Sequence, residues 1–317
     1  MEDPRDDQTN TVVGIAPDGD LILLVGPEET KLRVRSILLM AASKFFSVML
    51  GSDWKEGNGL RDRDGPYEIL LPEDNAAALK IICSIIHHEN SEVPQALAAD
   101  DVLAVAVAAD KYDCVNALRF ASESWLQHTK GNAGNLMLLT AAAYRFGHAQ
   151  AFKEITRALI LDYDGPYLAL SSEKVESVMT LKVLCLLEEQ RGFARLKIAE
   201  ILLAGINNPT GLCVHKCGWT SKYAYAYIKL LERKDLWPKH LFHTSISKAL
   251  ESAERMPDPI PEELSTECTY AYKHAAPEYR KERSWSLDTF HKSIGLCLYC
   301  IRLGSMSSNC SQDSHRC

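Results

Sequence analysis

The sequence has no long hydrophobic run. Its longest apolar stretches, residues 81–86 and 102–109, are far shorter than the ~20 apolar residues that a membrane-spanning helix needs. The opening residues, MEDPRDDQTN, are acidic and polar, and they lack the basic and apolar segments of a secretory signal. We therefore expect an intracellular protein with no membrane partner. No convincing basic cluster distinguishes the nucleus from the cytoplasm.

Motifs of the common enzyme chemistries are also missing. We find no glycine-rich phosphate loop, no serine nucleophile elbow, no His-Glu-x-x-His helix and no EF-hand loop. The net charge of −7 argues against a surface that coats nucleic acid. With 46% hydrophobic residues over 317 positions, the chain can bury real cores in about two domains. These features favour a globular protein that is not an enzyme and has no nucleic-acid partner.

The strand signal lies in residues 18–71. An apolar strand at residues 21–25 and an alternating strand at residues 31–35 flank a turn, and a third strand follows at residues 67–71. Polar residues that can cap helices lie between and after these strands. The candidate caps are Ser36, Ser43, Asn75 and Asp113, and the helices expected after them contain residues 37–42, 44–50, 76–87 and 115–125.

The sequence after residue 128 predicts helices separated by turns, and then a polar tail. We expect an α+β fold, in which a small sheet with surrounding helices is followed by a mainly α-helical C-terminal region. Gly192 is expected to separate two helices at residues 172–189 and 194–203. The expected regions are a disordered arm (1–17), the α+β domain (18–128), a helical region (129–204), a mixed helical region with paired cysteines (205–303) and a disordered tail (304–317).

The order of the first elements resembles the BTB/POZ domain, a protein-interaction fold. The family opens with a strand led by an acidic residue, matched here by Asp20, and its Leu-x-x-x-Ser-x-x-Phe segment appears at residues 39–46. Its Ala-Asp-Lys-Tyr step between the last two helices occurs at residues 109–112. Arg35 stands where the family often has a histidine, which is a departure. Residues 129–204 are similar to a BACK-like helical extension.

The resemblance implies a non-enzymatic scaffold that recruits protein partners and forms a homodimer. In the family, the elements matching Asp20 and residues 37–50 commonly form the dimer face, and Arg35 lies between them as a further candidate contact. A symmetric dimer buries the same patch twice. In such a dimer, residues 10–17, with Val12, Val13 and Ile15, would add a strand exchanged between the two copies. The same apolar residues equally suit the core of a monomer, so both interpretations are open.

Trp54-Lys55-Glu56 is similar to a hydrophobic-x-Glu step that some BTB adaptors present to a cullin ubiquitin-ligase scaffold. Trp54 would then be the aromatic anchor, and Glu56 would meet a polar or basic rim. A following helical region is typical of such adaptors. The alternative is a Trp54 that covers the end of the preceding helix, with Glu56 in solvent.

Ten cysteines are scattered along the chain. In a reducing compartment they serve as thiols or metal ligands rather than as disulfides. Two close pairs can each supply half of a structural zinc site, with the alternative that these thiols bind no metal. A zinc-stabilised region at residues 205–303 would also suit a second class of function, a nucleic-acid-binding or regulatory protein. The candidate ligands are Cys213, Cys217, Cys297 and Cys300, with His215 and His291 as alternatives.

Aromatic residues are concentrated after residue 218. Trp219, Tyr223 and Tyr227 recur every four residues, with lysines between them. This spacing is typical of the buried face of a helix. A stacking surface for nucleic-acid bases is the alternative, but the negative net charge argues against it. We therefore predict that these three side chains are core residues.

Overall fold

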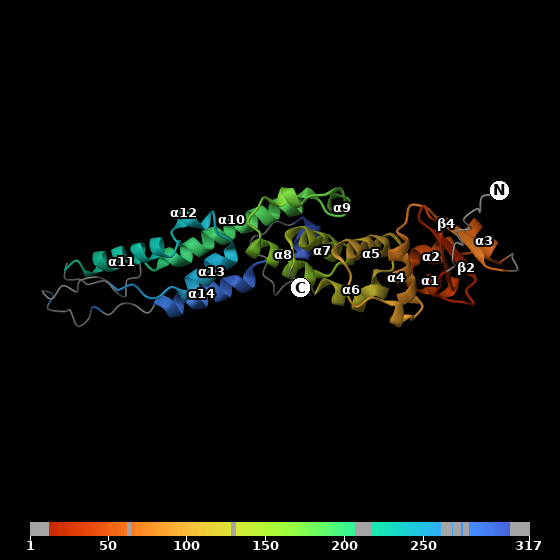
Figure 1. The fold of residues 1–317 in the computed structure, drawn as a ribbon, viewed down its shortest axis with the longest axis horizontal. Coiled ribbons are helices and arrows are strands. Elements are labelled where there is room, and N and C mark those ends of the chain that lie inside the picture. The colour runs from red at the N-terminus through yellow and green to blue at the C-terminus, as the bar shows by residue number, and fades with distance from the viewer. Residues whose placement is uncertain are drawn as a thin grey trace, which may run out of the picture. The chain divides into compact units, whose positions relative to one another are not determined.

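The structure is a computed structural model of the chain, and it describes residues 13–61, 65–127, 131–206, 217–260, 268, 274 and 279–304. The fold is α+β, as the sequence predicts, with one small sheet and many helices (Figure 1). The chain divides into two compact units. Among the described positions, the first unit contains residues 13–152 and 173–179, and the second contains residues 153–172 and 180–304.

The sheet of the first unit has the strand order β1-β3-β2-β4. Its strand β2 is antiparallel to β3 and parallel to β4, so that Leu21 lies opposite both Val34 and Tyr67. Every residue of β2 is buried, which explains its uninterrupted apolar sequence. The strands are β1 (Val13–Gly14), β2 (Leu21–Val25), β3 (Thr30–Val34) and β4 (Tyr67–Leu71). The three strands expected from the sequence are confirmed.

The fourth strand comes from the segment for which the sequence predicts a disordered arm or, in a dimer, a strand exchanged between two copies. Val13 and Gly14 pair in parallel with Leu32 and Arg33 of β3. Ile15 is buried next to them. The prediction of a disordered arm is therefore wrong for residues 13–17, because a short apolar segment gains both burial and an edge pairing on the sheet. Residues 1–12 lie outside the described part of the chain.

The helices of the first unit surround this sheet and extend beyond it. They are α1 (Ser36–Ala42), α2 (Lys44–Met49), α3 (Lys55–Arg61), α4 (Ala76–Ile86), α5 (Ala99–Lys111), α6 (Arg119–Leu126), α7 (Ala133–Phe146) and α9 (Glu173–Glu176). Helix α7 packs on α5 within this unit. The sequence boundary expected at residue 128 therefore falls inside a compact unit, and the unit limits and the predicted domain limits differ.

Two of the predicted helix caps are confirmed. Ser43 accepts a hydrogen bond from the Phe46 N–H at 3.0 Å, and Asn75 Oδ1 accepts one from the Ala78 N–H at 2.9 Å. Two others are wrong. Ser36 lies inside α1, where its hydroxyl donates to another side chain, and Asp113 has a positive φ of 48° before a short 3-10 helix.

The described part of the second unit is helical. Its helices include α10 (Leu181–Ala204), α11 (Trp219–Arg233), α12 (Pro238–Leu241), α13 (Ile246–Arg255), α14 (Tyr279–Ser293) and α15 (Leu298–Leu303), and α8 (Ala149–Asp162) contributes from residue 153 on. Helix α10 runs unbroken through Gly192, so the predicted break there is wrong. Buried residues such as Leu187 and Ala194 flank this glycine, and their packing outweighs its cost of about 1 kcal/mol.

Buried arginines hold the ends of two helices in the second unit. Arg191 donates to the carbonyls of Tyr163 at 3.1 Å and Gly165 at 2.7 Å, just after α8. Arg283 donates to the carbonyls of Ala253 and Met256 at the end of α13. Carbonyls at a helix C-terminus lack partners in the helix, so these guanidinium groups supply the missing donors.

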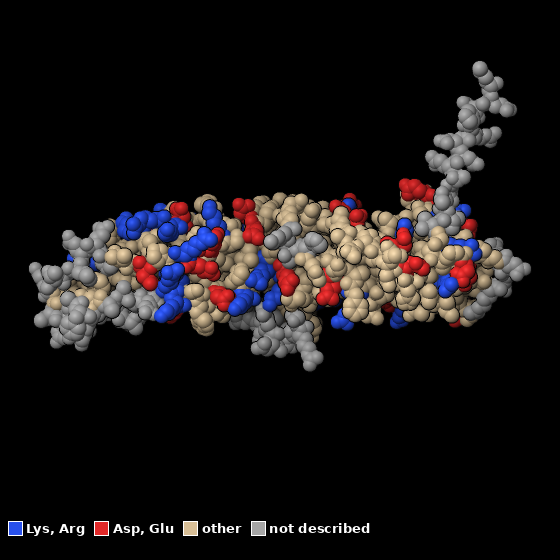
Figure 2. Space-filling view, turned by 60° about the horizontal axis from the view of Figure 1, so that its bottom comes forward, with Lys and Arg blue, Asp and Glu red and all other residues tan. Residues whose placement is uncertain are grey.

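The surface of the second unit carries many cations. On the face shown in Figure 2, Lys and Arg side chains gather over the part of the chain where Figure 1 places α12, α13 and α14. Some cations of the second unit pair with acids one helical turn away, such as Lys229 with Glu232 at 3.1 Å on α11 and Lys292 with Asp288 at 2.6 Å on α14. This pattern is typical of a solvated helix surface. Among the described helices, none has both the length and the apolar character to cross a membrane.

The aromatic residues of α11 lie in the core. Trp219, Tyr223 and Tyr227 are all buried on one face of the helix. The prediction that their four-residue spacing marks a buried face is confirmed.

Candidate functional site

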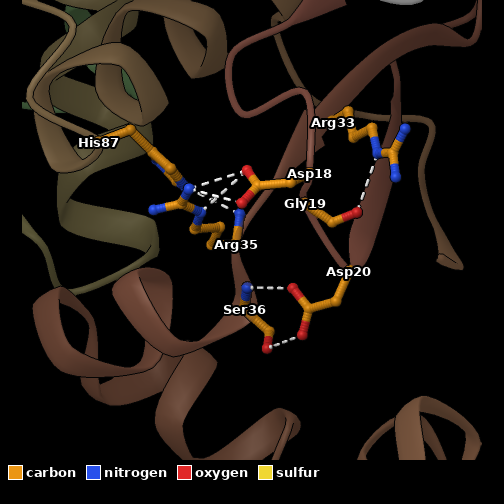
Figure 3. A network of polar contacts seen from close by, with 7 residues as sticks. All are labelled: Asp18, Gly19, Asp20, Arg33, Arg35, Ser36 and His87. Carbon is orange, nitrogen blue, oxygen red and sulfur yellow. Dashed lines mark hydrogen bonds and ion pairs between the residues drawn. The ribbon is translucent and has the colours of Figure 1, made fainter.

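A network of polar contacts surrounds the start of α1 (Figure 3). The Asp20 carboxylate accepts hydrogen bonds from the Ser36 N–H at 2.8 Å and from the Ser36 hydroxyl at 2.6 Å. Asp20 lies immediately before β2, so the strand positions an acid at the N-terminus of a helix 16 residues further along the chain. A carboxylate there satisfies an N–H that the helix leaves unpaired.

Arg35 is the second charged residue of this network. Its guanidinium donates to both carboxylate oxygens of Asp18, at 2.8 Å and 2.7 Å. The hydrogen bonds from Arg35 hold the pKa of Asp18 below its ordinary value. Both side chains are exposed. The predicted contact residues Asp20 and Arg35 therefore both lie at the start of α1, although they are distant in sequence, and each already has a partner within the chain.

His87 closes the network from the end of α4. Its Nε2 accepts the Arg35 backbone N–H at 2.8 Å, and its Nδ1 lies 2.8 Å from the Cys83 carbonyl oxygen. A carbonyl only accepts, so Nδ1 carries the proton and the ring is neutral. Burial, together with the charge of Arg35, lowers the pKa of His87. The sequence offered no sign of this contact, because the two residues are 52 positions apart.

Large apolar side chains are exposed on α1 and α2, next to this network. The exposed fractions are 71% for Ile37, 43% for Phe45 and 52% for Val48. Their neighbours Leu39 and Phe46 are buried, so the two helices place apolar residues on both their inner and outer faces. Phe45 and Val48 are three residues apart in α2 and hence share a side of that helix. These three residues, which we name the α1–α2 patch, are available for contact with another molecule.

The Trp54 side chain is 54% exposed at the start of α3, a helix that the sequence did not predict. Gly57, on the same helix, is buried, and a Cβ atom there would lie 1.9 Å from the Gly51 carbonyl oxygen. The close approach of α3 to this carbonyl requires glycine at position 57. Lys55 is exposed and Glu56 half-buried.

The structure brings together a different set of metal-ligand residues from the one predicted. Within the described part of the chain, one group of three residues could hold a metal ion: Cys217, Cys268 and His274. Their ligand atoms lie within 4.8 Å of one another. Cys268 and His274 were missed. The signal that could have found them is two ligand-type residues six positions apart in a segment with little helical pattern.

The other predicted ligands lie elsewhere or cannot be described. Cys213 and His215 are outside the described residues. Cys297 is the residue before α15 and Cys300 lies within it, and neither joins the described group. His291 instead accepts a hydrogen bond from Arg157 at 3.0 Å, and burial together with that cation lowers its pKa.

Comparisons with known proteins assign no function to these sites. No model of a protein family, no curated protein and no solved structure matches the chain. The resemblance of residues 18–128 to a BTB/POZ domain stays a prediction, supported by the residues quoted for it.

Proposed function

We propose that the chain is a non-enzymatic scaffold whose N-terminal part, residues 18–128, is a BTB/POZ-like module that binds a second copy of itself. The observation that carries this proposal is the α1–α2 patch, formed by Ile37, Phe45 and Val48. These side chains are exposed although Leu39 and Phe46 on the same two helices are buried. Helices α1 and α2 contact each other, and exposed apolar groups on one surface are typical of protein interfaces.

The energetics favour a homodimer as the occupant of this patch. Burying one such side chain contributes roughly 1.5–3 kcal/mol, and a two-fold symmetric dimer buries each of them twice. A stable interface needs about 800 Å² from each partner, so the α1–α2 patch would form its centre. The exposed pair of Asp18 and Arg35 lies near the start of α1, where polar groups would surround an apolar centre.

Sedimentation velocity on the full chain tests the dimer. We expect the mass of a dimer at micromolar concentration and the mass of a monomer for the double variant Ile37→Glu, Val48→Glu, because burying two carboxylates opposes association. Phe120→Glu is the matched control, since Phe120 is 84% exposed in the same unit but lies on α6. A wild-type monomer, or loss of the dimer in the control alone, would contradict the proposal.

Recruitment of a cullin is the more specific form of this function. The exposed indole of Trp54, directly before α3, supports Trp54 as the anchor of a partner contact. We expect that Trp54→Ala abolishes co-purification with a cullin and that Glu56→Ala weakens it. Trp285→Ala is the control, because Trp285 is equally large and 71% exposed in the second unit. Unchanged recovery by the Trp54 variant would rule the cullin out.

A further inference from the structure

Three soft donor groups from distant parts of the sequence meet before α11. Cys217 directly precedes Gly218, whose left-handed φ of 78° turns the chain into the helix. Cys268 is buried and His274 is half-buried, and both come from the segment between α13 and α14. Cys217 and His274 are 57 residues apart. Local chain geometry does not bring such residues together, so the tertiary fold does.

The distances agree with those around a tetrahedral metal ion. In a tetrahedral site, Zn–S bonds of about 2.3 Å and Zn–N bonds of about 2.0 Å place sulfur and nitrogen about 3.5 Å apart, and two sulfurs about 3.8 Å apart. Cys217 Sγ lies 3.4 Å from His274 Nε2. All three ligand atoms lie within 4.8 Å of one another. Small side-chain movements would bring the three donors onto one ion.

The histidine is oriented by a buried aromatic ring. His274 stacks on Trp219 with 5.0 Å between ring centroids and 5° between ring planes. Trp219 is itself buried at the start of α11. The stack fixes the plane of the imidazole and leaves its edge to face the thiol of Cys217. His274 Nδ1 is buried, and it has no hydrogen-bond partner among the described residues. A buried ring nitrogen normally has such a partner.

We propose that Cys217, Cys268 and His274 bind a zinc ion. Two thiolates and one imidazole are the donors that zinc prefers, and each thiol releases its proton to solvent when it binds. Tetrahedral zinc has four ligands, so the fourth comes from a donor other than these three residues. The site is structural: it closes the chain between Cys217 and His274 across α11, α12 and α13, so metal binding adds to the stability of the second unit.

Zinc content in matched variants tests the ligand set. The full chain is purified with reductant and without chelator, and metal is measured by mass spectrometry. We expect about one zinc per chain. Cys268→Ser and His274→Ala should lose more affinity than the ~10–100-fold that changes to outer-shell residues cause. Cys297→Ser and Cys300→Ser, at the pair that sequence spacing favoured, should keep the wild-type content.

Two further measurements separate loss of a ligand from loss of folding. His274→Cys retains a zinc ligand and should restore metal binding that His274→Ala removes. In the cobalt-substituted protein, Cys268→Ser should weaken the thiolate-to-cobalt absorption bands. The proposal is overturned by wild-type protein without zinc, by zinc that only Cys297→Ser and Cys300→Ser remove, or by a Cys217–Cys268 disulfide found in place of the metal.

Discussion

Five side chains at helix ends show two opposite kinds of chemistry, side-chain acceptors at helix starts in the first unit and buried side-chain donors at helix ends in the second, although the second unit also has an acceptor cap at Ser245. In the first unit, the acceptors Asp20 and Ser43 bind backbone N–H groups at the starts of α1 and α2, and His87 accepts the N–H of the residue before α1. In the second unit, the buried donors Arg191 and Arg283 bind backbone carbonyls at the ends of α8 and α13. Both arrangements follow the polarity of the helix, which leaves N–H groups unpaired at one end and carbonyls at the other.

These contacts differ in burial and in the number of backbone groups that each side chain binds, so their loss should destabilise the two units by different amounts. The acceptors of the first unit range from the exposed carboxylate of Asp20 to the buried hydroxyl of Ser43. Removing one of these side chains should therefore lower the free energy of unfolding by an amount that depends on its burial. Arg191 and Arg283 of the second unit are each buried and each bind two carbonyls at once. A buried polar group without a partner costs about 1–3 kcal/mol, so removing one donor that serves several acceptors should have the larger effect.

The largest effect is expected for Arg191→Ala. This change removes the donors to Tyr163 and Gly165 and the partner of Glu188. We expect the free energy of unfolding to fall by about 3 kcal/mol, measured by urea denaturation. Arg191→Lys should recover part of this, because lysine keeps the charge but not the planar fork. Arg35→Ala, which breaks an exposed pair, is the control. An equal shift in both would refute the comparison.

An intermediate effect is expected for Ser43→Ala. The buried hydroxyl of Ser43 accepts the Phe46 N–H and donates to the Tyr112 carbonyl, so its loss leaves two buried groups unpaired. We expect a loss of roughly 1–2 kcal/mol in the free energy of unfolding. Asn75→Ala removes one partly exposed cap contact and should have a smaller effect. A larger loss for Asn75→Ala would show that burial does not determine the difference.

The smallest effect is expected from acidification acting on His87. Its folded pKa lies below its ordinary value of 6.5, mainly because of burial. The unfolded chain therefore takes up a proton at a higher pH than the folded chain, and the contribution to stability is full above pH 6.5 and decreases as the pH falls. Each pH unit between the two pKa values corresponds to about 1.4 kcal/mol.

The pH dependence of thermal unfolding measures this effect. Wild-type protein should lose stability below about pH 6.5, and His87→Gln should show a weaker dependence. His291→Gln gives the matching change in the second unit, where the pKa of His291 is lowered in the same direction by burial and Arg157. An unchanged pH profile in both variants would exclude these histidines as its source.

Local features could be predicted from the sequence. The strands at residues 21–25 and 67–71 have the expected bounds, because strand periodicity and the residues that end a strand lie within a few positions. Ser43 and Asn75 were found as caps because a cap and its N–H are three residues apart. The buried face of α11 was predicted from the four-residue spacing of its aromatic residues, which is also a local pattern.

Features that depend on residues distant in the sequence could not be predicted from it. Asp20 replaces Ser36 as the acceptor at the start of α1, although 16 residues separate them. Gly192 does not end a helix, because buried residues on both sides stabilise it. The partners of Cys217 are Cys268 and His274 rather than the pair that its spacing suggested, because contact in space decides ligation and spacing only suggests it.

Hydrophobic periodicity, which needs no long-range information, was enough to predict the α+β class, the three main strands and the apolar segments of α1 and α2. The exposure of Ile37 and Val48, and the meeting of two thiols and an imidazole before α11, became visible only in the folded chain. The physical reason is that burial and coordination depend on groups brought close by folding, and chain order leaves many such pairings open.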